Sequence, residues 1–181
     1  MCNSFNKKFI DEAAKAMEQL TDNGIADHEI FMKQAIDNAI YGVLHNEGGP
    51  FGCVIIKDGK IIGKGNNKVT STNDPTAHAE VMAIREACKN LKSFQLDDCI
   101  MYTSCEPCPM CLGAIYWARP KKVYYGCNKK DADKIGFDDD FIYKEIEMEP
   151  VKSTIPFEQI NRKTAMKAFK VWEEKEDKIE Y

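Results

Sequence analysis

The amino-acid sequence predicts an α/β domain of three layers, in which helices cover both faces of a mixed central sheet. Two short β-rich runs at 52–57 and 60–64 are joined by Asp58-Gly59, a residue pair that is typical of tight hairpin turns. A helix, a strand, a second helix and another strand are then predicted in alternation further along the chain. A hairpin followed by such alternation indicates an α/β/α sandwich with strands of both orientations.

Apolar residues recur every three or four positions in several segments, which is the spacing of a helix with one buried face. Helices are therefore expected at about 5–20, 29–45, 77–90, 109–117 and 162–177. Residues that stop helices follow two of these segments. Gly48-Gly49-Pro50 closes the second, and Arg119-Pro120 ends the fourth because the residue before a proline avoids the helical region.

Two further strands are expected at 99–103 and 123–126, where short β-rich runs separate the helical segments. The acidic stretch 131–140 is expected to form a loop. The sequence shows neither an internal repeat nor a low-complexity tract, and its length suits a single domain.

The composition excludes several classes of protein. A chain of 181 residues with a net charge of −4 creates no positive field toward nucleic acid or anionic membranes. No stretch approaches the roughly 20 apolar residues that a membrane span needs, so no membrane partner is expected. The first 25 residues hold no signal-peptide pattern, which predicts a cytoplasmic location. Because that compartment keeps thiols reduced, the eight cysteines are candidates for metal binding and not for disulfides.

Two short segments, Thr-Ala-His-Ala-Glu and Pro-Cys-Pro-Met-Cys, stand at predicted helix starts. On a helix Cys108 and Cys111 would share one face, so both thiolates could bind one ion. His78 and Glu80 are two residues apart and can share a site only if His78 stands at the start of its helix. One His and two Cys would give zinc three ligands and leave a fourth position for water, as in catalytic sites. Glu80 would then act as an acid and a base.

Other interpretations of these residues stay open at this point. His78 alone could be an ordinary capping or core histidine. Cys105 could supply a fourth ligand, which would make a closed structural zinc site in a binding module and not an enzyme. An iron–sulfur cluster would need a further cysteine at the position where Ile115 stands.

A His-x-Glu motif followed downstream by Pro-Cys-x-x-Cys is the signature of the zinc-dependent nucleobase deaminases. From about residue 29 to its end, the chain resembles more specifically the bacterial guanine deaminases of the cytidine-deaminase-like fold. The segments that carry this resemblance are 48–52, 73–80, 103–120 and 136–139, together with Tyr181. Residues 1–25 would form an N-terminal helical extension that packs on the core or on a partner, and residues 26–181 the deaminase domain.

The resemblance implies a role for each matching residue. His78, Cys108 and Cys111 would bind zinc, and Glu80 and Asp139 would be the two catalytic acid/base groups. The residues implied to bind substrate are Phe51, Asn67, Ala79, Trp117 and Tyr181. The resemblance also implies a homodimer in which the C-terminal segment, about 130–181, is swapped and completes the partner's active site.

The expected function is the zinc-dependent hydrolytic deamination of guanine to xanthine and ammonia, in purine catabolism or salvage. Guanosine and aminated triazines are alternative substrates, because the sequence does not define the room in the pocket. Transfer-RNA adenosine deaminases are also related, and a basic cluster could follow a phosphate backbone, although the net acidity favours a solvated surface. The cluster consists of Arg119, Lys121, Lys122, Lys129 and Lys130.

Overall fold

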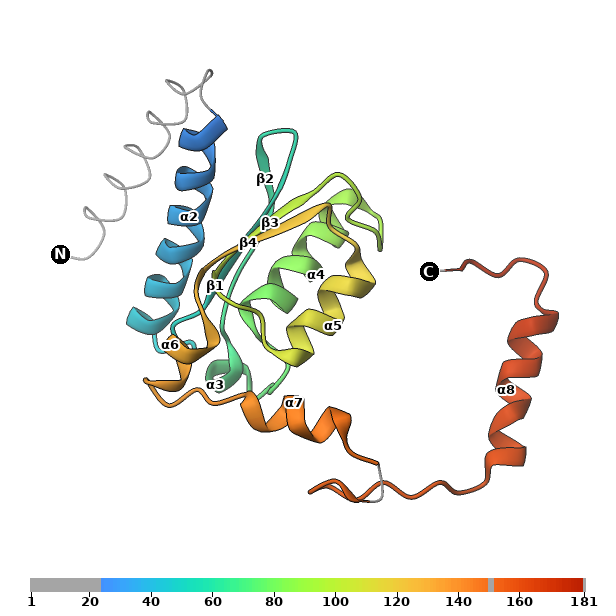
Figure 1. Cartoon of the computed structure of the whole chain (residues 1–181). Helices are drawn as coiled ribbons and strands as arrows, with labels where there is room; N and C mark the ends of the chain where they lie inside the picture. Colours follow the sequence, from blue (N-terminus) through green and yellow to red (C-terminus); the bar gives the residue numbers. More distant parts are fainter. Residues whose placement is uncertain (1–23, 150–151, 181) are drawn as a thin grey trace.

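The computed structural model describes residues 24–149 and 152–180. Its centre is a four-stranded sheet with the strand order β2-β1-β3-β4 (Figure 1). The strands are β1 (Gly52–Lys57), β2 (Lys60–Asn66), β3 (Ile100–Cys105) and β4 (Lys122–Cys127). β1 is antiparallel to both β2 and β3, whereas β3 and β4 are parallel, so the predicted mixed sheet is confirmed.

The hairpin between β1 and β2 turns at the predicted residue pair. Asp58 and Gly59 both have positive φ angles, 49° and 71°. A two-residue hairpin turn of this kind requires the left-handed region at both positions, which glycine adopts freely and aspartate tolerates. The turn therefore fixes the register in which Lys57 faces Lys60.

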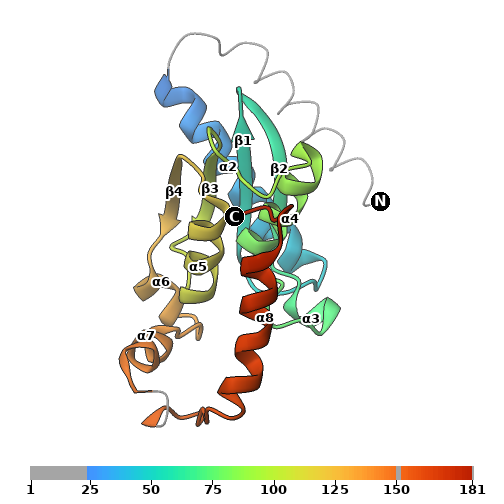
Figure 2. The same cartoon turned by 90° about the vertical axis from the view of Figure 1, so that its right-hand side faces the viewer.

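Helices cover both faces of the sheet, which confirms the three predicted layers (Figures 1 and 2). α2 (Gly24–Leu44) packs on one face, and α4 (Ala79–Leu91) and α5 (Pro109–Ala118) pack on the other. None of the described helices is long and apolar enough to cross a membrane.

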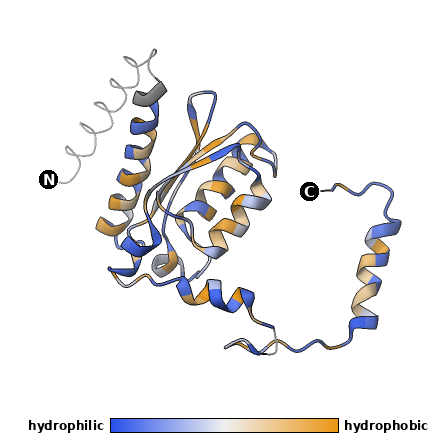
Figure 3. Cartoon of the chain, in the orientation of Figure 1, coloured by the Kyte–Doolittle hydropathy of each residue, from blue (hydrophilic) through white to orange (hydrophobic). Residues whose placement is uncertain are grey.

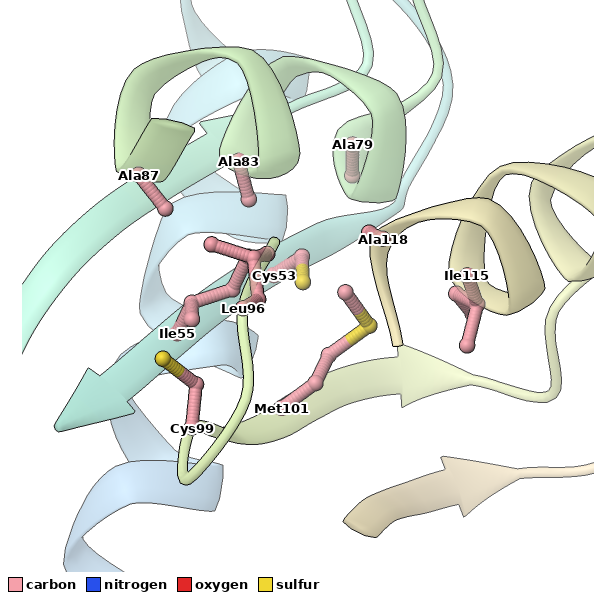
Figure 4. Packing of buried hydrophobic residues seen from close by; sticks show 10 residues of the cluster. All are labelled: Cys53, Ile55, Ala79, Ala83, Ala87, Leu96, Cys99, Met101, Ile115 and Ala118. Atoms are coloured by element: carbon pink, nitrogen blue, oxygen red, sulfur yellow. The ribbon is translucent and has the colours of Figure 1, made fainter. Parts of the chain in front are cut away.

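Alternate residues of the central strands point to the two helical layers, as the period of a strand requires. Val54 and Tyr102 belong to the cluster that contains Phe31 of α2. Ile55 and Met101 belong to the larger cluster, shown in Figure 4, on the side of α4 and α5. That cluster also holds two buried cysteines and three alanines of α4, namely Cys53, Cys99, Ala79, Ala83 and Ala87. The alanines let α4 lie close to the sheet.

Three short helices are present that the sequence did not predict. They are α3 (Val69–Thr72), α6 (Lys129–Asp133) and α7 (Asp140–Glu147). The expectation of an acidic loop at 131–140 was therefore wrong at both ends, because its acidic residues begin helices. Asp131 accepts a hydrogen bond from the Asn128 backbone N–H at 3.1 Å, which completes a capping box.

The last helix, α8 (Arg162–Glu174), stands clear of the sheet and of the helices that cover it (Figure 1). Figure 3 shows hydrophobic residues (orange) along α8, and every residue of this helix is exposed. The helix expected at 162–177 was predicted to have one buried face, yet Phe169 in it exposes 69% of its surface. The helix expected at 5–20 lies outside the described residues.

Close packing of α2 on β1 depends on Gly52. A Cβ atom there would collide with backbone atoms of Ala35 and Ala39 in α2, whereas a Cβ on Gly113 of α5 would meet nothing within 4 Å. We expect Gly52→Ala to lower the free energy of unfolding by about 1–3 kcal/mol, because the helix must shift. Gly113→Ala is the matched control and should be neutral or slightly stabilising. Urea unfolding of both variants measures the difference, and equal stability would contradict this packing.

Candidate active site

The N-termini of α4 and α5 meet at one edge of the sheet and bring the candidate ligands together. His78 is the N-cap of α4 and Cys108 the N-cap of α5, both with extended backbone. Pro109 follows Cys108 at the first helical position, where its fixed φ angle suits a helix start. His78 therefore stands at the start of its helix, as its two-residue spacing to Glu80 required. Cys108 lies just before its helix and not on the helix face that the sequence suggested.

The donor atoms of three residues form a compact group. The Nδ1 atom of His78 lies 3.5 Å from the sulfur of Cys108 and 3.5 Å from that of Cys111. All three donor atoms lie within 4.8 Å of one another. Two sulfurs and one imidazole nitrogen are a preferred donor set for zinc, and three ligands leave one tetrahedral position open. The residues present therefore fit a zinc ion.

The two thiols of this group differ in their pKa values. A hydrogen bond from Cys111 is the main reason that the pKa of the Cys108 thiol is lowered to about 4. The pKa of Cys111 is raised, chiefly because its thiol is the donor of that bond. The same thiolate holds the pKa of His78 above its usual value. The lowered pKa of Cys108 favours the thiolate form in which a cysteine binds a metal.

Cys105 does not join the donor group. Its buried thiol lies near the Asn128 carbonyl oxygen, to which it donates a hydrogen bond of 3.7 Å. Burial raises the pKa of this thiol to about 11, so it stays protonated at neutral pH. Among the described residues, the metal-binding group consists of His78, Cys108 and Cys111 alone. The closed four-ligand site considered from the sequence therefore finds no support in the geometry.

Glu80 is a buried carboxyl group next to the donor atoms. Its side chain is on the second residue of α4 and only 5% of the residue is exposed. The thiol of Cys111 lies 3.4 Å from its Oε2 atom. Burial is the main cause that raises the pKa of Glu80 above its usual value, which suits a group that must both accept and release a proton.

Asn67 and Phe51 lie on the loops at the same edge of the sheet. Oδ1 of Asn67 accepts hydrogen bonds from the backbone N–H groups of Gly49, at 3.3 Å, and Val69, at 3.1 Å. These bonds orient the amide so that its NH₂ group is the part left to donate. A Cβ on Gly48 would collide with this side chain, so the glycine allows the loop to approach it. The Asn67 backbone N–H also donates to the Phe51 carbonyl at 3.0 Å.

Asp139 reaches the site from the other side, at the N-cap of α7. Burial raises the pKa of its half-buried carboxyl group, and the charge of Lys129 opposes that increase. Asp139 is also close enough to contribute to the raised pKa of His78. Two residues earlier, Phe137 contacts the Phe51 ring edge-on, with ring centroids 4.9 Å apart. Phe137 was not among the site residues expected from the sequence, although its place in Gly-Phe-Asp-Asp, beside Asp139, was a signal for it.

The remaining expected substrate contacts lie in different places. Ala79 is fully buried at the start of α4, between His78 and Glu80. Trp117 is 63% exposed and lines a groove of about 310 Å³ on the outer side of α4 and α5, with Ile84 and Phe94. The groove lies along the helices and not at their N-termini, so Trp117 is not brought to the donor group. Tyr181 lies outside the described residues.

The fold and this donor group identify the class of protein. Residues 25–127 match the family described as the cytidine and deoxycytidylate deaminase zinc-binding region, and the chain belongs to this family of zinc-binding deaminases. The guanine deaminase of Bacillus subtilis is 58% identical over 155 residues, which cover 86% of this chain and 99% of that protein. Its crystal structure matches with a TM-score of 0.83 over 85% of this chain and 98% of that chain.

Two other relatives are more distant. The solved guanine deaminase of Nitrosomonas europaea is 30% identical, with a TM-score of 0.59, and the match covers 61% of this chain and 64% of that one. A tRNA-specific adenosine deaminase of Buchnera aphidicola is 42% identical over 107 residues, which cover 59% of this chain and 70% of that protein. The longer match to the Bacillus subtilis enzyme therefore includes more of this chain than the match to the tRNA enzyme.

Replacing single cysteines should separate ligands from neighbours. We expect Cys111→Ser to lower the zinc content of purified protein strongly, because the site loses a thiolate donor. Cys105→Ser is the matched control and should keep about one zinc per chain, because its thiol donates to Asn128 and lies outside the donor group. Metal analysis of both variants measures this. Loss of zinc from Cys105→Ser would show that four cysteine or histidine side chains hold the ion.

Proposed function

We propose that this protein hydrolyses guanine to xanthine and ammonia. The observation that carries the proposal is the buried Glu80 carboxyl next to three converging zinc donors, within a family of deaminases. Identity of 58% to a guanine deaminase along 99% of that enzyme supports guanine as the substrate. We place the reaction in purine catabolism or salvage, because it removes an amino group from a free base.

Glu80 is the group that moves protons. Zinc held by His78, Cys108 and Cys111 would lower the pKa of a bound water to roughly 7 and so supply the nucleophile. Glu80 would accept a proton from the attacking water and deliver it to the ring nitrogen next to C2, while the oxygen adds to C2. Because burial raises its pKa, Glu80 holds this proton at neutral pH more readily than an exposed carboxylate would.

Asp139 serves the leaving group. After water has added, the exocyclic nitrogen on C2 must be protonated before the C–N bond breaks and ammonia leaves. The raised pKa of Asp139, caused mainly by burial, makes it a suitable donor of that proton. The proton that the C2 hydroxyl loses as the carbonyl forms would then return Asp139 to its protonated state. It approaches the site from α7, opposite the helices that carry Glu80 and the zinc ligands, so the two acid/base groups come from separate elements.

The purine ring would be held by the loops at the sheet edge. The NH₂ group of Asn67 donates to an acceptor on the base, because its Oδ1 is already engaged by two backbone N–H groups. Phe51 offers an aromatic face, and the buried Ala79 lies at the wall between His78 and Glu80. Guanosine and aminated triazines stay alternative substrates for the same chemistry.

A transfer-RNA substrate has less support. Lys121 and Lys122 stand at the beginning of β4, whereas Lys129 and Lys130 follow its end, so the basic residues are about 20 Å apart along the strand. The cluster is therefore divided between opposite edges of the sheet and does not make one continuous track for a phosphate backbone.

The thiols that bind zinc must stay reduced, which supports a cytoplasmic location.

An ammonia-release assay tests the reaction directly. We expect the zinc-loaded protein to release ammonia from guanine faster than from guanosine, cytosine, cytidine or adenine. Glu80→Gln should keep its zinc and lose about 10²–10⁴-fold in turnover, because the amide cannot carry a proton. Faster release from another substrate would refute guanine as the substrate but not the zinc-dependent deamination. Near-normal turnover of Glu80→Gln would exclude this role for Glu80.

We further propose that the protein is a homodimer in which residues 152–180 of each chain pack on the partner. α8 exposes a stripe of large apolar side chains, including Met166, Phe169 and Trp172. In a single chain this apolar stripe is exposed to water, which is unfavourable, and packing against a second copy would bury it. The apolar groove beside Trp117 on α4 and α5 is a matching surface on the core. In such a dimer, Tyr181 would reach the partner's active site.

Mixing two inactive variants would reveal this exchange. Glu80→Gln damages the core of a chain and Tyr181→Ala damages its tail, so each variant alone should be weakly active. If tails are exchanged, a mixed dimer has one site with an intact core and an intact tail. Co-expression with random pairing should then restore about a quarter of normal activity. Activity no higher than the average of the two separate variants would contradict the exchange.

A further inference from the structure

The helix that carries Asp139 has few attachments to the rest of the protein. No residue of α7 is buried. On one side, the ring of Phe137 contacts Phe51, as described above. On the other side, the ammonium group of Lys129 lies 4.6 Å from the centroid of the Tyr143 ring. These two contacts join the region around the start of α7 to residues at the sheet edge.

Tyr143 is placed to control the position of Asp139. Asp139 is the N-cap of α7 and Tyr143 is the fourth residue of that helix, about one turn further along. The ring is half-buried, and the charges of Asp139, Glu106 and Cys108 add to the increase in the pKa of Tyr143 that burial causes. The ring is therefore near both the zinc-binding turn and the Asp139 carboxyl group.

Lys129 is itself fixed to the zinc-binding turn. Its backbone N–H donates to Oε2 of Glu106 at 3.1 Å, and the Glu106 N–H donates to the Cys127 carbonyl at 2.8 Å. Glu106 is two residues before the ligand Cys108. A continuous series of contacts thus leads from the zinc-binding turn, through Glu106 and Lys129, to the Tyr143 ring.

We propose that Lys129 and Tyr143 are positioning residues for the reaction, which keep the carboxyl group of Asp139 directed at the substrate amine. The proposal rests on the role proposed above for Asp139. The ammonium group sits over the ring face, where it is attracted by the negative charge of the π system. The pair holds the first turn of α7 at a fixed distance from the zinc-binding turn. Lys129 is half-buried, whereas its neighbour Lys130 is exposed and makes no such contact.

Steady-state kinetics with guanine, on the full-length zinc-loaded protein, test this pair. Lys129→Met and Tyr143→Leu should each lower kcat by about tenfold, because small errors in the position of a catalytic group are costly. KM for guanine and the zinc content should change by less than about twofold. Lys129→Arg and Tyr143→Phe keep the cation and the ring, so they should retain most of kcat. Lys130→Met is the matched control and should behave as the unmodified protein.

A double variant shows whether the effect passes through Asp139. When Asp139→Asn is already present, adding Lys129→Met should lower kcat by less than about twofold. A tenfold loss of kcat in the Asp139→Asn background would overturn the proposal. So would a kcat of the single variant Lys129→Met within twofold of normal, or a loss of zinc from that variant. If the unmodified protein released no ammonia from guanine, the proposed function itself would fail. If the unmodified protein is active on guanine and Lys129→Met leaves kcat unchanged, only the positioning role is refuted.

Discussion

The direction of the strands is the constraint on which the site depends. β2 and β3 are both antiparallel to β1, so they run the same way and end at the same edge of the sheet. β4 is parallel to β3 and ends there too, while β1 begins there. Everything that follows β2, β3 and β4, or precedes β1, is therefore gathered at one edge. Residues as distant in sequence as Phe51, Glu80 and Asp139 become neighbours for that reason.

Helix starts turn this edge into a place suited to anionic ligands. α4 and α5 both begin at the edge, and their N-terminal N–H groups give each a partial positive charge. This partial positive charge adds to the hydrogen bond from Cys111 in favouring the thiolate form of Cys108, whereas burial raises the pKa of Glu80. The alanines on the inner face of α4 contribute indirectly, because they seat the helix close to the sheet and fix where Glu80 lies.

The zinc-binding half of the site was predictable from the sequence, whereas the opposite wall was less so. The two-residue spacing of His78 and Glu80 already required a helix start, and Asp58-Gly59 defined the hairpin that directs β2 toward the edge. α6 and α7, with five and eight residues, are too short for apolar periodicity to mark them. The contact of Lys129 with Tyr143 depends on tertiary packing, and the sequence suggested only a solvated cation.

The two halves of the site are held with different firmness. The zinc ligands and Glu80 stand on helices whose inner faces are buried, so their relative positions are set by the core itself. Asp139 caps a helix that has no buried residue, and the contacts of Phe137 and Lys129 join this helix to the rest of the site. Under the proposed exchange of residues 152–180, the chain that follows α7 is also tied to the partner. Dimer formation would then restrain α7 from its C-terminal end. The position of Asp139, and with it the catalytic activity, would therefore depend on how much of the protein is dimeric.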